Sequence, residues 1–207
     1  MTSTATVFVI DDDDAVRNSL AELLTSVSLP VETYASGEEF LDAVGPDRPG
    51  CLVLDVRLKK SSGLDFQDEL RRRKVRLPII VLTGHGDVPS SVRAMKAGAF
   101  DFLQKPPPPA VLIERILAAI EADRLAHRVA SDRSDALKGL ASLTPREREV
   151  QAHLVAGSTS KEVAYDLGIS VRTVEGHRRR VLSKLGVTSA AQLVRVVMGT
   201  RDTPNVD

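Results

Sequence analysis

The sequence has one cysteine, Cys51, and no apolar run that approaches the length of a membrane span. A single cysteine excludes a disulfide within the chain, and a transmembrane helix needs ~18 or more apolar residues. The opening residues, MTSTATVFVI, have no basic segment ahead of their apolar part, which is not the pattern of a secretory signal. Internal repeats are also absent. We therefore expect a cytoplasmic protein that does not contact membranes.

The 207 residues carry no formal net charge, since 28 Lys/Arg balance 28 Asp/Glu, but the two halves of the chain differ. Residues 1–123 hold 14 Lys/Arg against 19 Asp/Glu, whereas residues 124–207 hold 14 against 9. A chain of this length can build two domains with cores. An acidic half joined to a basic half predicts two domains, of which the second has a polyanionic partner.

Strand and helix signals alternate along the first half. Short apolar runs predict the strands, and amphipathic stretches between them predict the helices. The predicted strands are 6–10, 31–34, 51–54, 78–82 and 100–103, and the predicted helices are 14–27, 36–44, 63–74, 88–97 and 109–125. This order predicts an α/β fold, a doubly wound parallel sheet of five strands, with its site at the carboxyl ends of the strands.

The second half contains helix signals and no strand signals. Residues 126–141 are charged and weakly apolar, and we interpret them as a linker that can continue the preceding helix. Thr144 and Glu147 have the spacing of a capping box, and further helices are predicted to begin after Thr159, after Ser170 and near residue 189. The sequence therefore predicts a small all-α domain.

Polar side chains follow each strand that can be central in the predicted sheet. Asp11 and Asp12 follow 6–10, Asp55 ends the third strand, Thr83 follows the fourth, and Lys105 follows the fifth. Three clustered carboxylates repel one another unless a cation neutralises them, and Mg²⁺ prefers such oxygen ligands. A hydroxyl and an ammonium beside them suit a phosphoryl group. Simple solvation of strand ends explains the carboxylates but not their neighbours.

The two remaining aspartates of the DDDD run have a local explanation. Asp13 and Asp14 precede and open a predicted helix, where negative charge interacts favourably with the helix dipole. We expect Asp13 and Asp14 to serve as helix-capping and first-turn residues rather than as part of the pocket.

The segments VFVIDDDDAVR, CLVLDVRL, VLTGHGD and AGAFDFLQKP resemble the receiver domain of response regulators, over about residues 1–124. The resemblance implies a flavodoxin-like fold in which Asp55 is the phosphoacceptor for a sensor histidine kinase. It also implies that Asp12, Asp55 and the backbone carbonyl of Arg57 hold Mg²⁺, and that Asp11 contributes through water.

The same resemblance assigns roles to residues on the fourth and fifth strands. Thr83 and Lys105 would bind the phosphoryl oxygens, and Phe102 would turn inward when Thr83 shifts. The sequence departs from the family at Lys59, where proline is usual, and in the proline run 106–109. Lys59 adds positive charge beside the pocket, and we interpret the prolines as a rigid entry to the next helix.

A basic helix is predicted at 170–185, SVRTVEGHRRRVLSKL, after a short turn from another helix, which is the helix-turn-helix arrangement. Residues 143–187 resemble the LuxR-type DNA-binding domain over its whole length. This resemblance implies that Glu175, Gly176 and Arg179 face base edges of double-stranded DNA. The candidates for phosphate contacts are Lys161, Arg172, Thr173, His177 and Arg180. His177 could instead pack inside the domain.

Both halves together resemble a response regulator of the NarL/FixJ type, closest to the FixJ branch. The expected division is a receiver domain over 1–124, a helical linker over 125–141 and a helix-turn-helix domain over 142–207. We expect phosphorylation to switch dimerisation and sequence-specific DNA binding, with RNA polymerase as a further partner. In receivers of this kind the dimer surface lies on the fourth helix and fifth strand, here at Val92, Arg93, Lys96 and Asp101.

Two other functions share some of these features. Phosphatases of the haloacid-dehalogenase type also use a nucleophilic aspartate, but they place a second aspartate two residues later, where this chain has Arg57, and their acidic pair comes last. A regulator that no longer needs phosphate has only Lys59 in its favour. We therefore expect a regulator rather than an enzyme, with at most slow loss of phosphate from Asp55.

Overall fold

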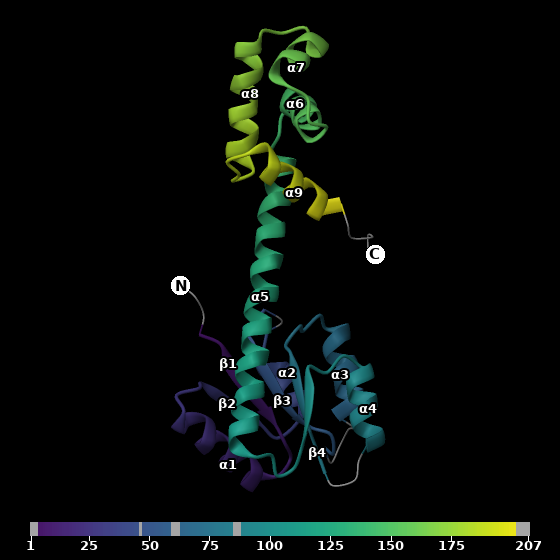
Figure 1. Cartoon of the computed structure of the whole chain (residues 1–207). Helices are drawn as coiled ribbons and strands as arrows, with labels where there is room; N and C mark the ends of the chain where they lie inside the picture. The colour runs from purple at the N-terminus through teal and green to yellow at the C-terminus, as the bar shows by residue number, and fades with distance from the viewer. Residues whose placement is uncertain (1–3, 46, 59–62, 85–87, 202–207) are drawn as a thin grey trace. The chain divides into compact units, whose positions relative to one another are not determined.

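The computed structural model describes residues 4–45, 47–58, 63–84 and 88–201 (Figure 1). The chain forms two compact units, Met1–His127 and Arg128–Asp207. Lys59 and His85 lie outside the described residues. Within those residues, no helix combines the length and the hydropathy that crossing a membrane requires.

The first unit is built around a parallel sheet with strand order β2-β1-β3-β4-β5. Its strands are β1 (Thr6–Ile10), β2 (Val31–Tyr34), β3 (Gly50–Asp55), β4 (Ile79–Thr83) and β5 (Asp101–Gln104). Its helices are α1 (Asp14–Ser26), α2 (Gly37–Ala43), α3 (Gly63–Arg72), α4 (Val88–Lys96) and α5 (Pro109–Ala141). The doubly wound fold predicted from the sequence is confirmed, and each strand lies within one residue of its predicted ends.

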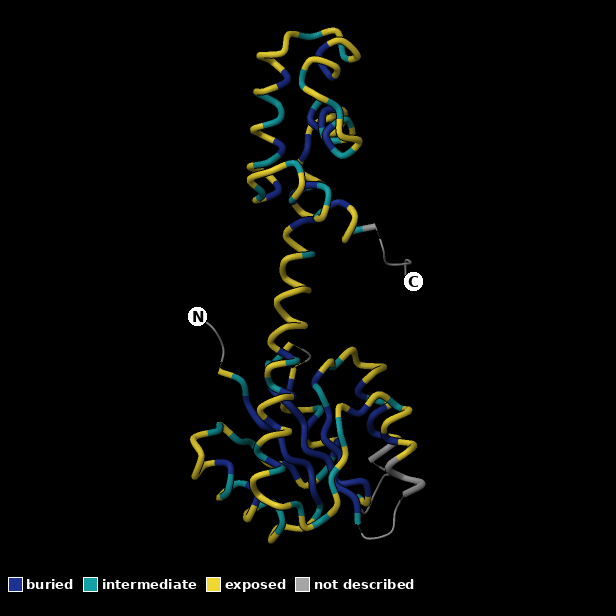
Figure 2. The backbone as a smooth tube through the Cα atoms, viewed as in Figure 1, coloured by how far each residue is buried: buried dark blue, intermediate teal, exposed yellow. Residues whose placement is uncertain are grey.

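Two apolar cores cover the two faces of this sheet. Phe8 and Ile10 point to a core shared with α2, α3 and α4, whereas Val7 and Val9 point to a core shared with α1 and α5. The central strands β1 and β3 are buried along their whole length and are accordingly dark blue in Figure 2. Because both faces are covered, these strands are continuous apolar runs rather than alternating ones.

Helix α5 continues beyond residue 125, as the sequence analysis allowed when it interpreted 126–141 as a linker that can continue the preceding helix. It has 33 residues and includes the stretch interpreted as a linker. No glycine or proline interrupts it between Pro109 and Gly139, and Glu121 pairs with Arg124 one turn later. Every residue from Arg124 to Asp132 is exposed. The helix therefore continues through this stretch without a core to pack on.

The second unit contains the helices α6 (Pro145–Val155), α7 (Ser160–Leu167), α8 (Val171–Lys184) and α9 (Ala190–Arg201). Thr144 forms the predicted capping box, Thr159 forms another at the start of α7, and Ser170 caps α8 by accepting a hydrogen bond from the Thr173 amide. Gly168 ends α7 with φ of 63°, a left-handed conformation that glycine adopts without strain. Side chains from all four helices form one core.

A buried carboxylate joins the start of α6 to the end of α8. Glu147 is 3% exposed and accepts hydrogen bonds from the Thr144 amide at 2.9 Å and from Lys184 Nζ at 2.7 Å. Lys184 also donates to the carbonyl oxygen of Ser142. The bond from Lys184, followed by those from Thr144, lowers the pKa of Glu147 from 4.5 to about 2.

This contact predicts an acid-sensitive second unit. Because the folded-state pKa of Glu147 is depressed, its contribution to stability is complete above pH 4.5 and is lost as the pH falls toward 2. The protection of the α8 amides against hydrogen exchange, expressed relative to the intrinsic rate at each pH, should therefore fall over that range. Glu147→Gln should exchange faster than the wild type at neutral pH and show less of the acid response. Glu149→Gln, on the exposed side of the same helix, should match the wild type, and equal profiles for both variants would contradict the prediction.

Candidate functional sites

The predicted acidic pocket is assembled at the carboxyl ends of β1 and β3. Side-chain oxygens of Asp11, Asp12 and Asp55 all lie within 4.8 Å of one another. Asp11 is 1% exposed and Asp55 is 8% exposed, whereas Asp12 is half-buried. The three carboxylates meet because β1 and β3 are hydrogen-bonded neighbours in the sheet.

Two of these carboxylates are fixed at both oxygens. Oδ1 of Asp11 accepts from the Asp13 amide at 3.0 Å, and Oδ1 of Asp55 accepts from the Arg57 amide at 3.1 Å. Their Oδ2 atoms face Lys105 Nζ, at 2.5 Å from Asp11 and 2.9 Å from Asp55. The backbone thus sets the orientation of each carboxylate, and one ammonium bridges the two.

Lys105 remains a cation in this setting. Burial by itself would lower its pKa, but the hydrogen bonds and charges of Asp55 and Asp11 outweigh that effect and raise the pKa above its ordinary value. Its amide donates to the Thr83 carbonyl at 2.7 Å, which places it beside the end of β4, and the Lys105–Pro106 peptide is cis. Lys105 therefore offsets part of the negative charge of the pocket.

The two residues expected to switch differ in their environment. Thr83, at the end of β4, is buried, and β4 pairs with β3 up to Asp55. Phe102, on β5, is 42% exposed. Thr83 is thus enclosed within the sheet, whereas the ring of Phe102 is in contact with solvent.

The other half of the DDDD run belongs to α1, as predicted. Asp13 is the N-cap and accepts from the Ala15 amide at 2.8 Å. Asp14 opens the helix and pairs with Arg17, which also donates to the Asp11 carbonyl. Four adjacent aspartates therefore divide into two pocket residues and two helix-start residues.

The predicted dimer residues lie on the surface of α4 and β5. Val92, Arg93 and Lys96 are exposed. Asp101 is already engaged within the chain, because its carboxylate accepts from the Phe102 amide at 2.8 Å and lies 3.2 Å from Nε of Arg115 on α5. Sequence reasoning missed Arg115, which is far along the chain from Asp101.

Exposed apolar side chains accompany these charges. Val92, Met95 and Phe102 are each more than two-fifths exposed, and we call these three residues together with Arg93, Lys96 and Asp101 the α4–β5 surface. Met95 follows Val92 by three residues on one helix, a spacing from which the sequence could have identified it.

A second exposed feature of the first unit is an apolar groove between α1 and the start of α5. It has a volume of about 530 Å³ and borders Lys105. Its lining residues are Ala15, Val16, Ser19, Leu20, Leu23, Leu82, Lys105, Pro106, Pro107, Pro109 and Leu112. The proline run is thus part of a surface beside the acidic pocket, which the sequence analysis did not anticipate.

The basic helix α8 buries one face and exposes another. Val174 and Val181 face the core, whereas Arg172, Glu175 and Arg179 are exposed and follow one another at helical spacing. Thr173 and Arg180 are exposed on the neighbouring side, and Gly176 and His177 are half-buried. The residues of α8 that are predicted to face DNA therefore occupy two adjacent strips of this helix.

Two of these side chains have contacts that the sequence did not predict. Glu175 accepts a hydrogen bond from Ser160 Oγ at the start of α7. Nδ1 of His177 is buried and has no hydrogen-bond partner within the described part of the chain. The sequence left open whether His177 contacts DNA or packs inside the domain. The Nδ1 side of its ring is packed inside the domain.

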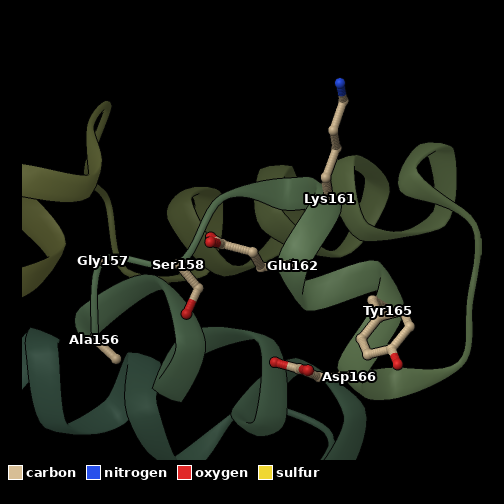
Figure 3. A pocket seen from close by; sticks show the side chains of 7 residues that line it. All are labelled: Ala156, Gly157, Ser158, Lys161, Glu162, Tyr165 and Asp166. Atoms are coloured by element: carbon tan, nitrogen blue, oxygen red, sulfur yellow. The ribbon is translucent and has the colours of Figure 1, made fainter.

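Lys161 lies on α7, beside a hollow between the end of α6 and α7 (Figure 3). Its side chain points away from the other labelled side chains in that view. Tyr165, one turn later, is 89% exposed and also lines the hollow, but the sequence analysis did not single it out. Lys161 is therefore free to reach a ligand outside the domain.

Comparison with known proteins identifies the class. Residues 7–117 match the model of the response regulator receiver domain, and residues 141–197 match that of the LuxR family of bacterial regulatory proteins. The chain therefore belongs to the two-component response regulators that join a receiver domain to a LuxR-type DNA-binding domain.

The most similar relatives include transcriptional regulators that match over most of their length. The chain is 46% identical to the transcriptional regulatory protein TdiR of Thauera aromatica, over 94% of this chain and 86% of that protein. It is 47% identical to the transcriptional regulatory protein FixJ of Azorhizobium caulinodans, over 93% of this chain and 91% of that one. The solved structure of the response regulator StyR matches with a TM-score of 0.84 and 38% identity, covering 94% of this chain and 98% of that one.

Proposed function

We propose that a histidine kinase phosphorylates Asp55 and that this modification switches dimerisation and sequence-specific DNA binding. The observation that carries the proposal is the pocket at the carboxyl ends of β1 and β3. There Asp55 lies with Asp11 and Asp12 within 4.8 Å and Lys105 within 2.9 Å. The family to which the chain belongs gives both a kinase and DNA as partners.

The donor set of the pocket fits Mg²⁺, which prefers carboxylate and carbonyl oxygens. Asp12, Asp55 and the carbonyl of Arg57 would hold the ion, with Asp11 contributing through water. When bound, the ion would neutralise the charge that builds up on the transferred phosphoryl group.

The chain's own residues perform the transfer. An oxygen of Asp55 attacks the phosphorus of the phosphohistidine, the new O–P bond forms, and the P–N bond breaks to return the electron pair to the imidazole. Lys105 and Thr83 bind the phosphoryl oxygens. Because Lys105 now holds Asp55 and Asp11, it must exchange part of that contact for the phosphoryl group. Thr83 then shifts, and Phe102 turns inward.

The apolar groove between α1 and the start of α5 is a suitable docking surface for the kinase. It borders Lys105, so a helix of the kinase seated there would bring its phosphohistidine to the pocket. Three of the four prolines, Pro106, Pro107 and Pro109, line this groove and make one wall of it rigid.

The second unit reads DNA through α8. We assign base contacts to Glu175, Gly176 and Arg179. Phosphate contacts are assigned to the remaining predicted residues, Lys161, Arg172, Thr173, His177 and Arg180. Since Nδ1 of His177 is buried, a phosphate contact would use Nε2.

We further assign residues 1–124 to the receiver, 125–141 to a helical linker and 142–207 to the DNA-binding domain. RNA polymerase is a proposed partner, and a DNA-bound regulator of this kind works in the cytoplasm.

Acetyl phosphate with Mg²⁺ tests the whole scheme. We expect one phosphoryl group per chain on intact-protein mass spectrometry, because among the described residues one cluster of carboxylates has this arrangement. DNA affinity should rise at the same time, measured by fluorescence anisotropy on a duplex that the phosphorylated protein selects from a random library. Full phosphorylation with no gain in affinity would favour the regulator that does not need phosphate.

Dimerisation gives a second prediction. The phosphoryl group adds about −1.5 to −2 charge to the pocket and favours a state that dimerises through the α4–β5 surface. In an isologous dimer Arg93 or Lys96 of one chain would meet Asp101 of the other, twice per dimer. Asp101→Arg should therefore block dimerisation and leave phosphorylation of Asp55 intact. Sedimentation velocity with and without the phosphodonor measures this.

The intrachain partner of Asp101 supplies the control. Arg115→Ala removes the cation that now occupies Asp101 but leaves the acidic side chain in place. It should dimerise at least as well as the wild type, since Asp101 is freed for the second chain. Exposed ion pairs contribute only about 0–1 kcal/mol each, so they select the arrangement more than they drive it. An Asp101→Arg protein that still dimerises on phosphorylation would rule out this surface.

A further inference from the structure

A buried carboxylate on α5 has no part in the acidic pocket. Asp123 is 3% exposed, and its Oδ2 accepts a hydrogen bond from the Gly50 amide at 2.9 Å. Nε2 of His127, one turn later on the same helix, lies 3.5 Å from Oδ1. Gly50 is the first residue of β3, so this contact ties α5 to the amino end of a central strand.

The position of Gly50 admits no other residue. Its φ is 149°, and a Cβ added there would lie 1.9 Å from the carbonyl oxygen of Thr6 on β1. The backbones of β1 and β3 therefore approach closely at this edge. A side chain from another element, Asp123, accepts the Gly50 hydrogen bond, and a buried amide without a partner would cost free energy.

The other end of β3 contacts the segment that leads into α5. Asp55 ends the strand, and its Oδ2 contacts Lys105, which lies four residues before the first residue of α5. Both ends of β3 thus make polar contacts with this part of the chain: Gly50 with Asp123, in the middle of α5, and Asp55 with Lys105, just before α5 begins. The contact at Asp55 is the one that phosphorylation changes, whereas the contact at Gly50 lies at the opposite edge of the sheet.

Apolar packing fills the space between these contacts. Leu112, Ile116 and Ala119 of α5 pack in the same core as Cys51 and Val53 of β3. Such packing holds α5 on the sheet but is not directional. The hydrogen bond to Gly50 adds to this packing a directional contact at one point of the helix.

We propose that Asp123 is a positioning residue that fixes one point of α5 on β3 and thereby couples the phosphorylation of Asp55 to the rest of this helix. The proposal rests on the proposed function. When Lys105 exchanges Asp55 for the phosphoryl group, the start of α5 moves. Because Asp123 stays bound to Gly50, that movement becomes a rotation of α5 about this point rather than a slide along the sheet. The helix continues to Ala141, so the rotation reaches residues of the second unit.

The coupling needs an acceptor oxygen more than a charge. Burial raises the pKa of Asp123 above its ordinary value, whereas the Gly50 amide and His127 act in the opposite direction. An asparagine can accept from Gly50 with its carbonyl oxygen and donate its amide to a neutral His127. An alanine can do neither. Comparing the asparagine and alanine variants therefore shows whether the hydrogen bond or the negative charge of Asp123 is required.

The experiment compares Asp123→Ala, Asp123→Asn and Glu121→Gln in the full chain. Glu121 is exposed on the same helix and pairs with Arg124, so its substitution is the matched control. Hydrogen exchange of the Gly50 amide, followed by NMR, reports the contact itself. Phosphorylation is followed by intact mass after treatment with acetyl phosphate and Mg²⁺. The gain in affinity on phosphorylation is measured with the duplex selected by the wild-type protein.

We expect Asp123→Ala to accelerate Gly50 exchange about tenfold, the order of one net hydrogen bond. Basal DNA affinity and phosphorylation should match the wild type. Coupling between sites changes an affinity by about 5- to 150-fold, and this variant should lose most of that gain. Asp123→Asn should restore both the protection of Gly50 and the gain, and Glu121→Gln should behave as the wild type.

Three results would overturn the proposal in different ways. Unchanged Gly50 exchange in Asp123→Ala would show that the hydrogen bond is not formed. Fast exchange with an undiminished gain in DNA affinity would show that the contact is made but does not couple. Wild-type protein that is phosphorylated without any gain would overturn the proposed function, and the coupling with it, while the Gly50 exchange rates would still show whether the contact exists.

Discussion

Asp55→Asn should accept no phosphoryl group from acetyl phosphate, while the fold of the pocket is retained. The amide of asparagine is not a nucleophile for phosphorus, but its oxygen can still accept from the Arg57 amide as Asp55 does at 3.1 Å. The substitution also removes one of three carboxylates that lie within 4.8 Å of one another. Since like charges at that distance repel, the thermal unfolding temperature should not fall. Intact-protein mass spectrometry measures the phosphoryl group, and circular dichroism measures unfolding.

The variant Asp12→Ala tests the proposed Mg²⁺ site without changing the proposed phosphoacceptor, Asp55. This variant keeps Asp55 together with its contacts to Lys105 and the Arg57 amide, but it removes one proposed ligand of Mg²⁺. It should fold and lose most of the Mg²⁺-dependent phosphorylation. A labelled Asp55→Asn protein would place the acceptor elsewhere, and an unchanged rate in Asp12→Ala would count against the metal site.

Arg179→Ala should relax base preference, whereas Lys161→Ala should weaken all DNA sequences alike. Arg179 is exposed on the same strip of α8 as Arg172 and Glu175, where a planar guanidinium can pair with guanine. A good pair of this kind contributes about 1–3 kcal/mol of discrimination against the wrong base. Lys161 lies on α7 and points away from its neighbours, which suits a phosphate contact that positions the domain without reading sequence (Figure 3).

The two variants are compared on the selected duplex and on single-base variants of it, at several salt concentrations. Arg179→Ala should bind the parent and one base variant with similar affinity. Lys161→Ala should keep the wild-type ranking and reduce the slope of affinity against salt by about 1, because one fewer counterion is released. Arg180→Ala, another proposed phosphate contact, should behave like Lys161→Ala. Identical selectivity profiles for Arg179→Ala and Lys161→Ala would refute the division into base and phosphate contacts.

The sequence by itself determined the order of elements and the place of the pocket. Buried parallel strands require continuous apolar runs, so β1 and β3 could be identified from VFVI and CLVL. Caps are local as well: Thr144 and Glu147 meet because they are three residues apart at a helix start. Once the strands are parallel, their carboxyl ends share one edge, which brings Asp11, Asp12 and Asp55 together.

The tertiary structure alone decided which distant side chains pair. Lys105 forms ion pairs with both Asp11 and Asp55, and Arg115 forms one with Asp101. Asp123 accepts a hydrogen bond from the amide of Gly50, 73 residues away in the sequence. The hydrogen bond from Ser160 to Glu175 also joins two separate helices. Such contacts depend on the register and rotation of one element against another, and hydrophobic periodicity gives only the face that each element buries. For this reason the sequence could locate the pocket but could not show that one end of β3 contacts Asp123 of α5 and the other contacts Lys105, just before that helix.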